Sequence, residues 1–393
     1  MSESRIAQII LNGFRNHAAL SISPNKGIVA LVGDNGTGKT NILEAISLFT
    51  PGRGLRRAEL CDMVSHNQIP AERTVSFSVP TPGGFSVSIS LETGYGEKRL
   101  GTGISCNPDA PGKAQRIRRI DGITVSSASA FLEYLRILWL TPDMDGLFRG
   151  SAGERRRFLD RLVLAVDKDH GSRVNALERS LRSRNKILEE TPDRAAWLDA
   201  VEREIAELGI AVVLARREGV DRLTNLINTT RNDTSPFPFA LLDLKGEIDT
   251  LVAQHAAVDA EELYRAILRQ NRQRDRIAGR TLIGPQASDL VVRHGPKDII
   301  AERASTGEQK ALLIGLILAQ AHLIKQMSGF APLVLLDEIA AHLDERRKMA
   351  LFDDLESFSG QIWITGADRK AFDSLMDRAS VFELRDGGIH PLC

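Results

Sequence analysis

A glycine-rich segment near the N-terminus has the residue types that hold a chain of phosphates. It matches the pattern G-x-x-x-x-G-K-[ST] through Gly33, Asp34, Asn35, Gly36, Thr37, Gly38, Lys39 and Thr40. Glycines let successive backbone N–H groups turn toward one anion, and a helix that begins at the lysine adds the positive end of its dipole. We expect Lys39 to reach the outer phosphates of a nucleotide and the Thr40 hydroxyl to bind Mg²⁺. Asn41 completes the predicted site.

The residues on both sides of this loop predict the strand and the helix that a phosphate site needs. Residues 28–32 (IVALV) are a continuous apolar run, which predicts a strand buried on both faces of a parallel sheet. Residues 41–48 then place apolar side chains at helical spacing. A chance match to the loop pattern would lack this context, so we interpret the segment as a P-loop that binds ATP.

A second candidate element follows an apolar run near the other end of the chain. Residues 333–336 (LVLL) predict a buried strand that ends in Asp337 and Glu338. An acidic side chain at such a strand end can hold Mg²⁺ through its water shell, and we assign that role to Asp337. We assign Glu338 the catalytic role of orienting the attacking water and accepting its proton. The alternative is an ordinary strand end, and the P-loop elsewhere in the chain favours a nucleotide site.

A third segment, Ser305–Gln309 (STGEQ), precedes a long apolar helix. It resembles the signature motif of ABC ATPases, which acts on the nucleotide held by the opposite subunit. The Ser305 hydroxyl, the Gly307 backbone N–H and the helix dipole would contact a γ-phosphate, and Gln309 is included in this set. The alternative is a plain helix cap, closed by Glu308 or Gln309. The order of P-loop, signature segment and acidic strand end favours the signature motif.

The segment 341–344 (AHLD) resembles the D-loop of the same ATPases. The resemblance places Asp344 at the seam between two subunits. The alternative is a cap for a helix that begins at Glu345.

The elements that must position these residues lie at both ends of the chain. Strands are predicted at 5–11, 28–32, 333–336, 361–365 and 381–384, with short antiparallel strands within 74–125. The segment 151–232 has helical periodicity, and we expect further helix up to Gln273. The predicted fold class is therefore α/β, with an ABC-type P-loop ATPase domain built from both chain ends and a mainly helical inserted lobe. The predicted boundaries are 1–140 and 279–393 for the two parts of the ATPase domain and 141–278 for the lobe.

Composition excludes several classes of protein. The chain has 51 basic and 51 acidic residues, which argues against a protein that coats nucleic acid through charge alone. Three widely spaced cysteines indicate neither a disulfide framework nor a zinc site. The N-terminus lacks the pattern of a signal peptide, and the longest apolar run, at 311–321, is too short to span a bilayer. We therefore expect a cytoplasmic protein that has no membrane partner.

Arginine clusters are the candidates for contacts with DNA phosphates. We favour Arg53, Arg56 and Arg57, because they follow the P-loop helix directly and could respond to the nucleotide. Other clusters lie at Arg116, Arg118 and Arg119, at Arg155, Arg156 and Arg157, at Arg182, Arg184 and Lys186, and at Arg272, Arg274 and Arg276. The alternative for each cluster is a solvated helix face paired with glutamates. Aromatic residues make up only 5% of the chain, so we expect duplex binding rather than base stacking on single strands.

Several segments together resemble the RecF family of DNA replication and repair proteins, which belongs to the SMC-like branch of the ABC ATPases. They are 12–16 (NGFRN), 40–46 (TNILEAI), 119–122 (RIDG), 140–143 (LTPD), 150–160 (GSAGERRRFLD), 182–188 (RSRNKIL) and 280–285 (RTLIGP). The resemblance extends over most of the chain. It implies a homodimer that forms with ATP between the subunits, binds double-stranded and gapped DNA, and helps load the recombinase RecA with RecO and RecR. It also implies slow, DNA-stimulated ATP hydrolysis that serves as a switch.

The chain departs from the family pattern at three places. Gln286 and Ala287 stand where the family often has a histidine and a basic residue. Thr365 is followed by Gly366, where ABC ATPases usually carry a switch histidine, and Trp139 stands where some relatives carry a glutamine. Slow hydrolysis would fit the last two departures.

Four other functions compete with the one that this resemblance implies. A transporter ATPase subunit keeps the P-loop and the signature motif much closer together than Thr40 and Ser305 are here. An SMC-like tether needs long heptad arms, which the sequence lacks, and a small-molecule kinase would lack the segment Ser305–Gln309. An ABC-type ATPase subunit of another, non-repair complex stays open as the alternative.

Overall fold

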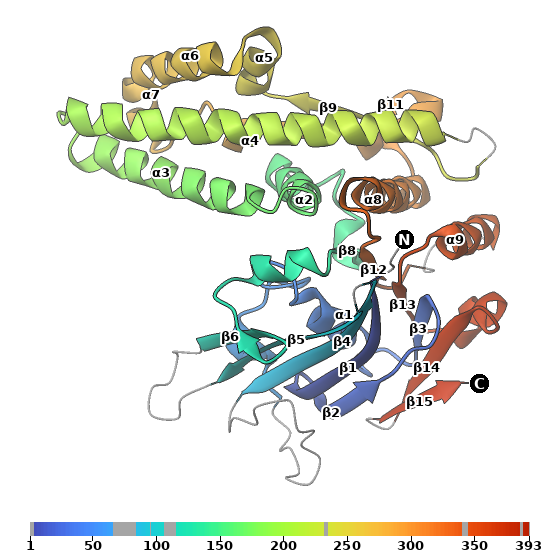
Figure 1. Cartoon of the computed structure of the whole chain (residues 1–393). Coiled ribbons are helices and arrows are strands. Elements are labelled where there is room, and N and C mark those ends of the chain that lie inside the picture. The colour runs from blue at the N-terminus through green and yellow to red at the C-terminus, as the bar shows by residue number, and fades with distance from the viewer. Residues whose placement is uncertain are drawn as a thin grey trace. The chain divides into compact units, whose positions relative to one another are not determined.

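The computed structural model describes residues 4–65, 84–94, 96–105, 115–231, 235–339, 345–385 and 388–392 (Figure 1). These residues form two compact units. The terminal unit takes the described parts of Met1–Met144 and Gln320–Cys393, and the middle unit takes those of Asp145–Asp233 and Pro238–Ala319. The two chain ends thus share one unit. The domain boundaries predicted at 140 and 279 stay a prediction, and residues 279–319, with the signature segment, belong to the middle unit.

An antiparallel sheet forms one layer of the terminal unit. Among the described residues its order is β2-β1-β4-β5-β6-β7. Its strands are β1 (Arg5–Phe14), β2 (His17–Ile22), β4 (Phe85–Thr93), β5 (Gly96–Ser105), β6 (Gln115–Ile120) and β7 (Ile123–Thr124). Phe85, Val87 and Ile89 are buried while the serines between them are not, because alternate side chains of a strand point to opposite faces. The antiparallel strands expected here are confirmed, whereas the run at 75–79 lies outside the described residues.

A second, mostly parallel sheet carries the predicted nucleotide site. Its order among the described residues is β15-β14-β3-β13-β12-β8, and only β15 runs antiparallel to its neighbour. The strands are β3 (Ile28–Val32), β8 (Ile137–Leu140), β12 (Leu333–Leu336), β13 (Ile362–Gly366), β14 (Ala379–Arg385) and β15 (Gly388–Leu392). Every residue of β3 and β12 is buried, as the continuous apolar runs predicted. The fold class predicted from sequence is confirmed.

One apolar core joins the two sheets of the terminal unit. The helix α1 (Lys39–Ser47) contributes Ile42, Leu43 and Ile46 to it, beside inward side chains of β1, β4, β3 and β12. The chain ends are also tied by polar contacts, since the Ile6 backbone N–H donates to Gln361 Oε1 at 2.9 Å. Helix α9 (Glu345–Ser357) buries one face of its own. The P-loop therefore stands on a strand and a helix that are both fixed by the core.

The middle unit is mainly helical (Figure 1). Its helices are α2 (Ala152–Leu164), α3 (His170–Glu190), α4 (Ala195–Thr230), α5 (Glu247–Gln254), α6 (Ala257–Gln270), α7 (Arg272–Ala278) and the first part of α8 (Thr306–Ser328). The long helix α4 packs along α3 and α6, and with 36 residues it extends about 54 Å. A core of aliphatic side chains and Tyr264 holds α3, α4, α5 and α6 together.

A small sheet in the middle unit corrects the sequence prediction. We expected helix up to Gln273, but β9 (Ala240–Lys245) lies within that range and pairs antiparallel with β10 (Asp289–His294). The short strand β11 (Ile299–Ile300) pairs with the other edge of β10. The pairing partner of β9 lies more than forty residues away in sequence, so local periodicity did not indicate it.

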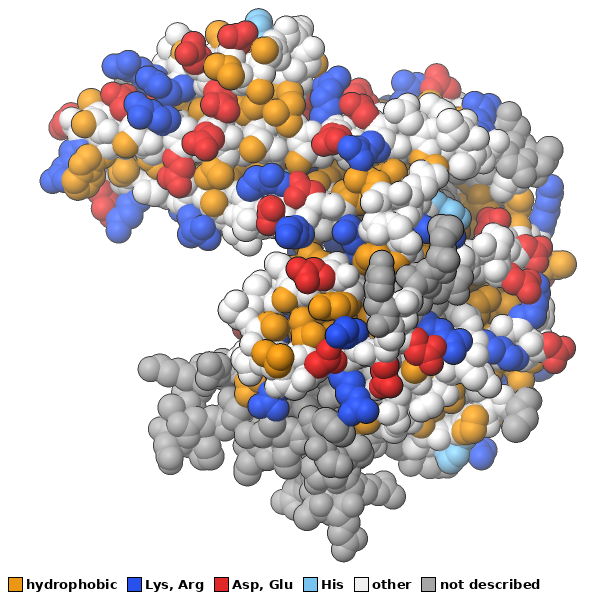
Figure 2. Space-filling model, viewed as in Figure 1, with side chains coloured by type: hydrophobic (Ala, Val, Ile, Leu, Met, Phe, Trp, Pro, Cys, Tyr) orange, Lys and Arg blue, Asp and Glu red, His pale blue; other side chains and the backbone are white. Residues whose placement is uncertain are grey.

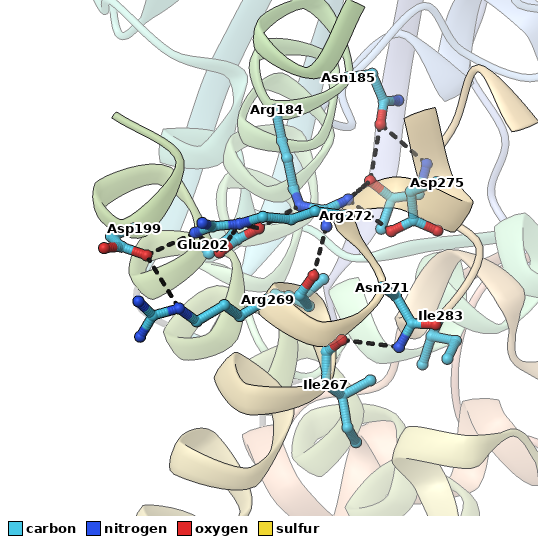
Figure 3. A network of polar contacts seen from close by, with 12 residues as sticks. Arg184, Asn185, Asp199, Glu202, Ile267, Arg269, Asn271, Arg272, Asp275 and Ile283 are labelled. Atoms are coloured by element: carbon cyan, nitrogen blue, oxygen red, sulfur yellow. Dashed lines mark hydrogen bonds and ion pairs between the residues drawn. The ribbon is translucent and has the colours of Figure 1, made fainter. Parts of the chain in front are cut away.

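A buried ion network joins α3, α4 and α7 (Figure 3). Arg184 is fully buried and donates to Glu202 at 3.0 Å, to Asp275 at 2.7 Å and to the Thr281 hydroxyl at 2.8 Å. Arg272 donates to the second oxygen of Glu202. Each buried charge therefore has a charged partner, which is the condition under which such groups are tolerated inside a protein.

Among the described residues, one helix is long and apolar enough to cross a membrane by length and composition, namely α8. In its most apolar window, 61% of the residues are buried inside the protein. A core helix has the same composition, so this feature is weak evidence for a membrane span.

Candidate nucleotide site

The P-loop connects β3 to α1 through three glycines with positive φ. Gly33, Gly36 and Gly38 have φ of 145°, 87° and 101°, a region that favours glycine. A Cβ atom at Gly33 would lie 2.5 Å from the Leu384 carbonyl oxygen, and one at Gly38 would lie 2.5 Å from His17 Nε2. The loop is therefore packed too closely for side chains at these two positions.

The N-terminus of α1 is available to an anion. No side chain caps its first backbone N–H groups, and its first turn contains no acidic residue. The positive end of the helix dipole is thus not compensated within the helix, which is the arrangement that attracts phosphate.

Lys39 lies along the loop that precedes it. Its Nζ donates to the carbonyl oxygens of Gly33 at 2.5 Å and Asp34 at 2.8 Å. Burial lowers the pKa of Lys39, and the nearby carboxylates of Glu338 and Asp337 oppose that shift. The cation is thus held inside the loop, next to the groups that would face the phosphates.

Thr40 and Asp337 meet at the base of the site. The Thr40 hydroxyl donates to the Asp337 carboxylate, whose oxygens lie at 2.9 and 3.0 Å. Burial raises the pKa of Asp337, and hydrogen bonds from Thr365 and Thr40 oppose this. One hydroxyl and one carboxylate side by side fit Mg²⁺, which takes its remaining ligands from phosphate and water. The described residues contain no cluster of three or more His, Cys, Asp or Glu side chains that could hold a metal ion.

Thr365, at the end of β13, connects the two acidic residues. Its hydroxyl donates to Asp337 Oδ1 at 2.7 Å and accepts the Glu338 backbone N–H at 2.9 Å. Glu338 has φ of 50°, a left-handed conformation that costs about 1–3 kcal/mol in a non-glycine residue. Thr365 therefore holds the turn at the end of β12 in a strained conformation. The sequence drew attention to this position only as the place of a missing histidine.

The turn between β1 and β2 braces the P-loop, which sequence reasoning missed. Asn16 Nδ2 donates to the Thr37 carbonyl at 3.1 Å, and its Oδ1 accepts from Asn41 Nδ2 at 2.7 Å. His17 Nε2 lies 3.2 Å from the Gly38 carbonyl oxygen, and burial lowers the pKa of its ring. Asn41, which we expected at the nucleotide, is thus engaged by the brace in this conformation. The NGFRN segment was the available signal, although it carried no physical meaning on its own.

A buried carboxylate anchors the residues behind the loop. Glu44 of α1 is fully buried and accepts from Arg15 Nε at 2.9 Å and Nη2 at 2.7 Å. Arg56 lies 3.3 Å from the same carboxylate and donates to Asn41 Oδ1 at 2.6 Å. This part of the unit is held by charge-assisted hydrogen bonds.

The preferred DNA-binding cluster lies in an exposed segment after α1. Arg53 forms an ion pair with Glu59, and Arg56 is shared with Glu44 and Asn41. Arg57 is exposed and has φ of 54°. The structure therefore gives Arg56 a bracing role as well, and the DNA contacts of all three stay a prediction.

The other basic clusters are used partly inside the chain. Arg116 donates to the Leu48 carbonyl, and burial lowers its pKa to about 10. Arg155 pairs with Asp289 at 2.7 Å, while Arg184 belongs to the buried network. On the face drawn in Figure 2, basic and acidic side chains are interspersed, in keeping with the zero net charge of the chain.

The signature segment begins α8 as a capping box. The backbone N–H and the hydroxyl of Ser305 donate to Glu308 Oε2 at 3.0 and 2.9 Å, and the Glu308 N–H points back to Ser305 Oγ. Gly307 lies in the first turn of the helix. Gln309 is 1% exposed and donates to the carbonyls of Glu302 and Ala304. The buried amide of Gln309 thus braces the segment in this conformation, and its contact with a nucleotide stays a prediction.

Three remaining predictions have different outcomes. Asp344 lies outside the described residues. Trp139 lies within β8 with its ring in the core, so it is a packing residue rather than a loop residue at the site. Gln286 donates to the carbonyls of Thr281 and Ile283, which gives it a local role within its turn.

Comparisons with known proteins agree with this geometry. A family model described as an AAA domain matches residues 8–121. The DNA replication and repair protein RecF of Rhizobium rhizogenes is 48% identical over 98% of this chain and 98% of its own length. That of Mesorhizobium japonicum is 47% identical over 99% and 98%.

Solved structures share the fold. One of the recombination mediator protein RecF in the RecFOR pathway, designated RecF-ATPrS, superposes with a TM-score of 0.83 at 20% identity and covers 100% of this chain and 99% of its own. The Smc head domain from Pyrococcus furiosus, bound to the C-terminal domain of ScpA, superposes with a TM-score of 0.53 at 19% identity, with coverage of 100% and 96%.

The chain has the fold of an ABC-type ATPase, which it shares with the SMC head. The family follows from the sequence identity of 48% and 47% to the two RecF proteins over almost the whole length of the chain. The chain belongs to the RecF family of DNA replication and repair proteins.

Proposed function

We propose that this chain binds ATP–Mg²⁺ at its P-loop and uses it to close a homodimer on double-stranded and gapped DNA during recombinational repair. Slow, DNA-stimulated hydrolysis then reopens the dimer. The observation that carries the proposal is the contact between Thr40 and Asp337 beneath the uncapped start of α1, with Lys39 held in the same loop.

Each residue of the site has a separate task in this proposal. The backbone N–H groups of the P-loop and Nζ of Lys39 bind phosphate oxygens, while Thr40 and Asp337 hold Mg²⁺. The bound metal supplies positive charge that offsets the negative charge of the outer phosphates. Ser305 and Gly307 of a second copy contact the nucleotide from the other side, which makes closure depend on ATP.

Glu338 is the residue that acts on water. Its side chain follows Asp337 at the end of β12, and the strained backbone there sets its direction. We propose that it orients the attacking water and accepts its proton. Thr365 holds the turn in place but offers no ring nitrogen for hydrogen bonding, which supports slow turnover.

We further propose that the chain works in the cytoplasm with RecR- and RecO-type mediators and assists loading of a RecA recombinase. The supporting observations are the family membership and the solved relative described as a recombination mediator in the RecFOR pathway.

Nucleotide binding by the Lys39→Ala variant tests the site. The change removes the loop cation, so the affinity for a fluorescent ATP analogue with Mg²⁺ should fall by about a hundredfold. The matched control is Lys26→Ala, because the Lys26 side chain donates to the Asp377 carbonyl in the same unit. The binding is measured by fluorescence anisotropy. If the Lys39→Ala variant binds the analogue with wild-type affinity, the P-loop is not the nucleotide site.

A further inference from the structure

Both polar donors of Ser305 are taken within its own helix. The backbone N–H and the hydroxyl each donate to Glu308 Oε2. A serine hydroxyl has one proton, so it cannot donate to Glu308 and to a phosphate oxygen at once. The position of the Glu308 carboxylate therefore decides whether Ser305 is available.

The second oxygen of that carboxylate is held from outside the helix. Lys297 Nζ lies 2.6 Å from Glu308 Oε1, and His294 Nε2 lies 3.9 Å from the same atom. Hydrogen bonds from Lys297 and Ser305 lower the pKa of Glu308 to about 2, so the carboxylate is ionised at neutral pH. Lys297 is thus the main cation beside a negative charge at the start of α8.

The turn that carries Lys297 is itself fixed. His294 is buried at the end of β10, and its Nδ1 accepts the Lys297 backbone N–H at 3.3 Å. Gly295 packs so closely on the ring of Phe239 that a Cβ atom there would overlap it. A side chain on a fixed turn can hold a partner in one position at a lower entropic cost than one on a loose loop.

An ionised carboxylate at the first turn of a phosphate-binding helix has two effects. It occupies the donors of Ser305, and it repels any phosphate that approaches. A lysine that pairs with the carboxylate reduces this repulsion. The repulsion matters only if a phosphate approaches this helix.

We propose that Lys297 is a positioning residue for the signature segment, because it neutralises the charge of Glu308, so that the nucleotide of a second copy can approach Ser305 with less repulsion. The inference rests on the proposed function, since it presumes that a second copy brings its nucleotide to Ser305. On this proposal Lys297, which lies outside the signature segment, sets the ATP concentration at which the dimer closes.

The test compares the ATP concentration that gives half-maximal dimerisation, measured by light scattering. Lys297→Met leaves the ionised Glu308 unpaired, so about tenfold more ATP should be needed, while Lys297→Arg should behave like wild type. In the background of Glu308→Gln there is no charge to neutralise, so adding Lys297→Met should change nothing further. Lys297 is exposed, so its replacement leaves the core intact.

Arg293→Met is the matched control, because Arg293 lies on the same hairpin, is exposed, and pairs with Asp298 instead of Glu308. It should need the same ATP as wild type. The inference is overturned if Lys297→Met also dimerises at the wild-type concentration, or if it loses as much in the Glu308→Gln background as alone. If wild-type protein itself stays monomeric with ATP, the proposed function fails and this inference fails with it.

Discussion

At the scale of single residues, the nucleotide site depends on a few hydrogen bonds around Asp337. Its carboxylate accepts from two threonine hydroxyls that come from different parts of the chain, Thr40 at the end of the P-loop and Thr365 near the end of β13. Thr365 also accepts the backbone N–H of Glu338. Asp337, Glu338 and the parallel sheet are thus connected through one hydroxyl.

Replacing Glu338 tests its role as the base. Glu338→Gln keeps the shape of the side chain but cannot accept a proton, so ATP turnover should fall by at least about a hundredfold. Nucleotide binding should be retained, because Lys39, Thr40 and Asp337 are unchanged. Steady-state phosphate release checks the prediction, and unchanged turnover would show that another group activates the water.

Replacing Thr365 tests the bridge. Thr365→Val removes one of the two hydroxyl donors to Asp337 Oδ1 and the acceptor of the Glu338 N–H, which should lower the free energy of unfolding by about 1–3 kcal/mol. Thr365→Ser keeps the hydroxyl and should lose much less. Urea unfolding of the three proteins gives the comparison, and a Val variant as stable as the Ser variant would show that the hydroxyl contributes nothing specific.

At the scale of elements, the middle unit is held by the ion network around Arg184 as well as by its apolar core. The short helix α7, of seven residues, is attached to α3 through Asp275 and to α4 through Arg272. A helix this short is not stable alone in water, so these contacts determine its position.

Replacing Arg184 tests this network. Arg184→Met leaves Glu202 and Asp275 buried with fewer partners, so the free energy of unfolding should fall by about 3–5 kcal/mol. Arg182→Met is the control, because the Arg182 side chain is 69% exposed and pairs with Glu178 one turn away. That change should lie within about 0.5 kcal/mol of wild type in urea unfolding. Equal effects of the two changes would show that the buried ion pairs contribute nothing specific.

The same residues show what the sequence could and could not predict. Strands β3 and β12 and the helix α1 were predicted because their apolar periodicity is local. The exposed or buried state of an arginine depends on partners far along the chain, so Arg184 looked like a member of a surface cluster. The brace of Asn16 and His17 on the P-loop was missed for the same reason, because it joins residues that only the fold brings together.

At the scale of the whole molecule, the proposed homodimer has to bind DNA through phosphate contacts. The net charge is zero, so binding must depend on local cations rather than on the overall field. The Arg53–Arg57 segment is the proposed contact, and Arg56 is the least suitable residue for a test because it also pairs with the buried Glu44.

Salt dependence tests the contact without that complication. Arg53→Ala and Arg57→Ala should each weaken ATP-dependent binding to a duplex and reduce the slope of log affinity against log salt by about one. Arg378→Ala is the control, because Arg378 pairs with Glu356 and Asp353 elsewhere in the terminal unit. If the control changes the slope as much as the two variants do, the proposed segment is not the contact.

The most direct test of the account is the mass of the protein in solution, with and without ATP–Mg²⁺ and a gapped duplex. We expect ATP to double the mass of the wild-type protein, the duplex to join the dimer, and Lys39→Ala to stay monomeric in every condition. A wild-type protein that remains a monomer with ATP and DNA would contradict it, because Ser305 and Gly307 would then have no second nucleotide to contact.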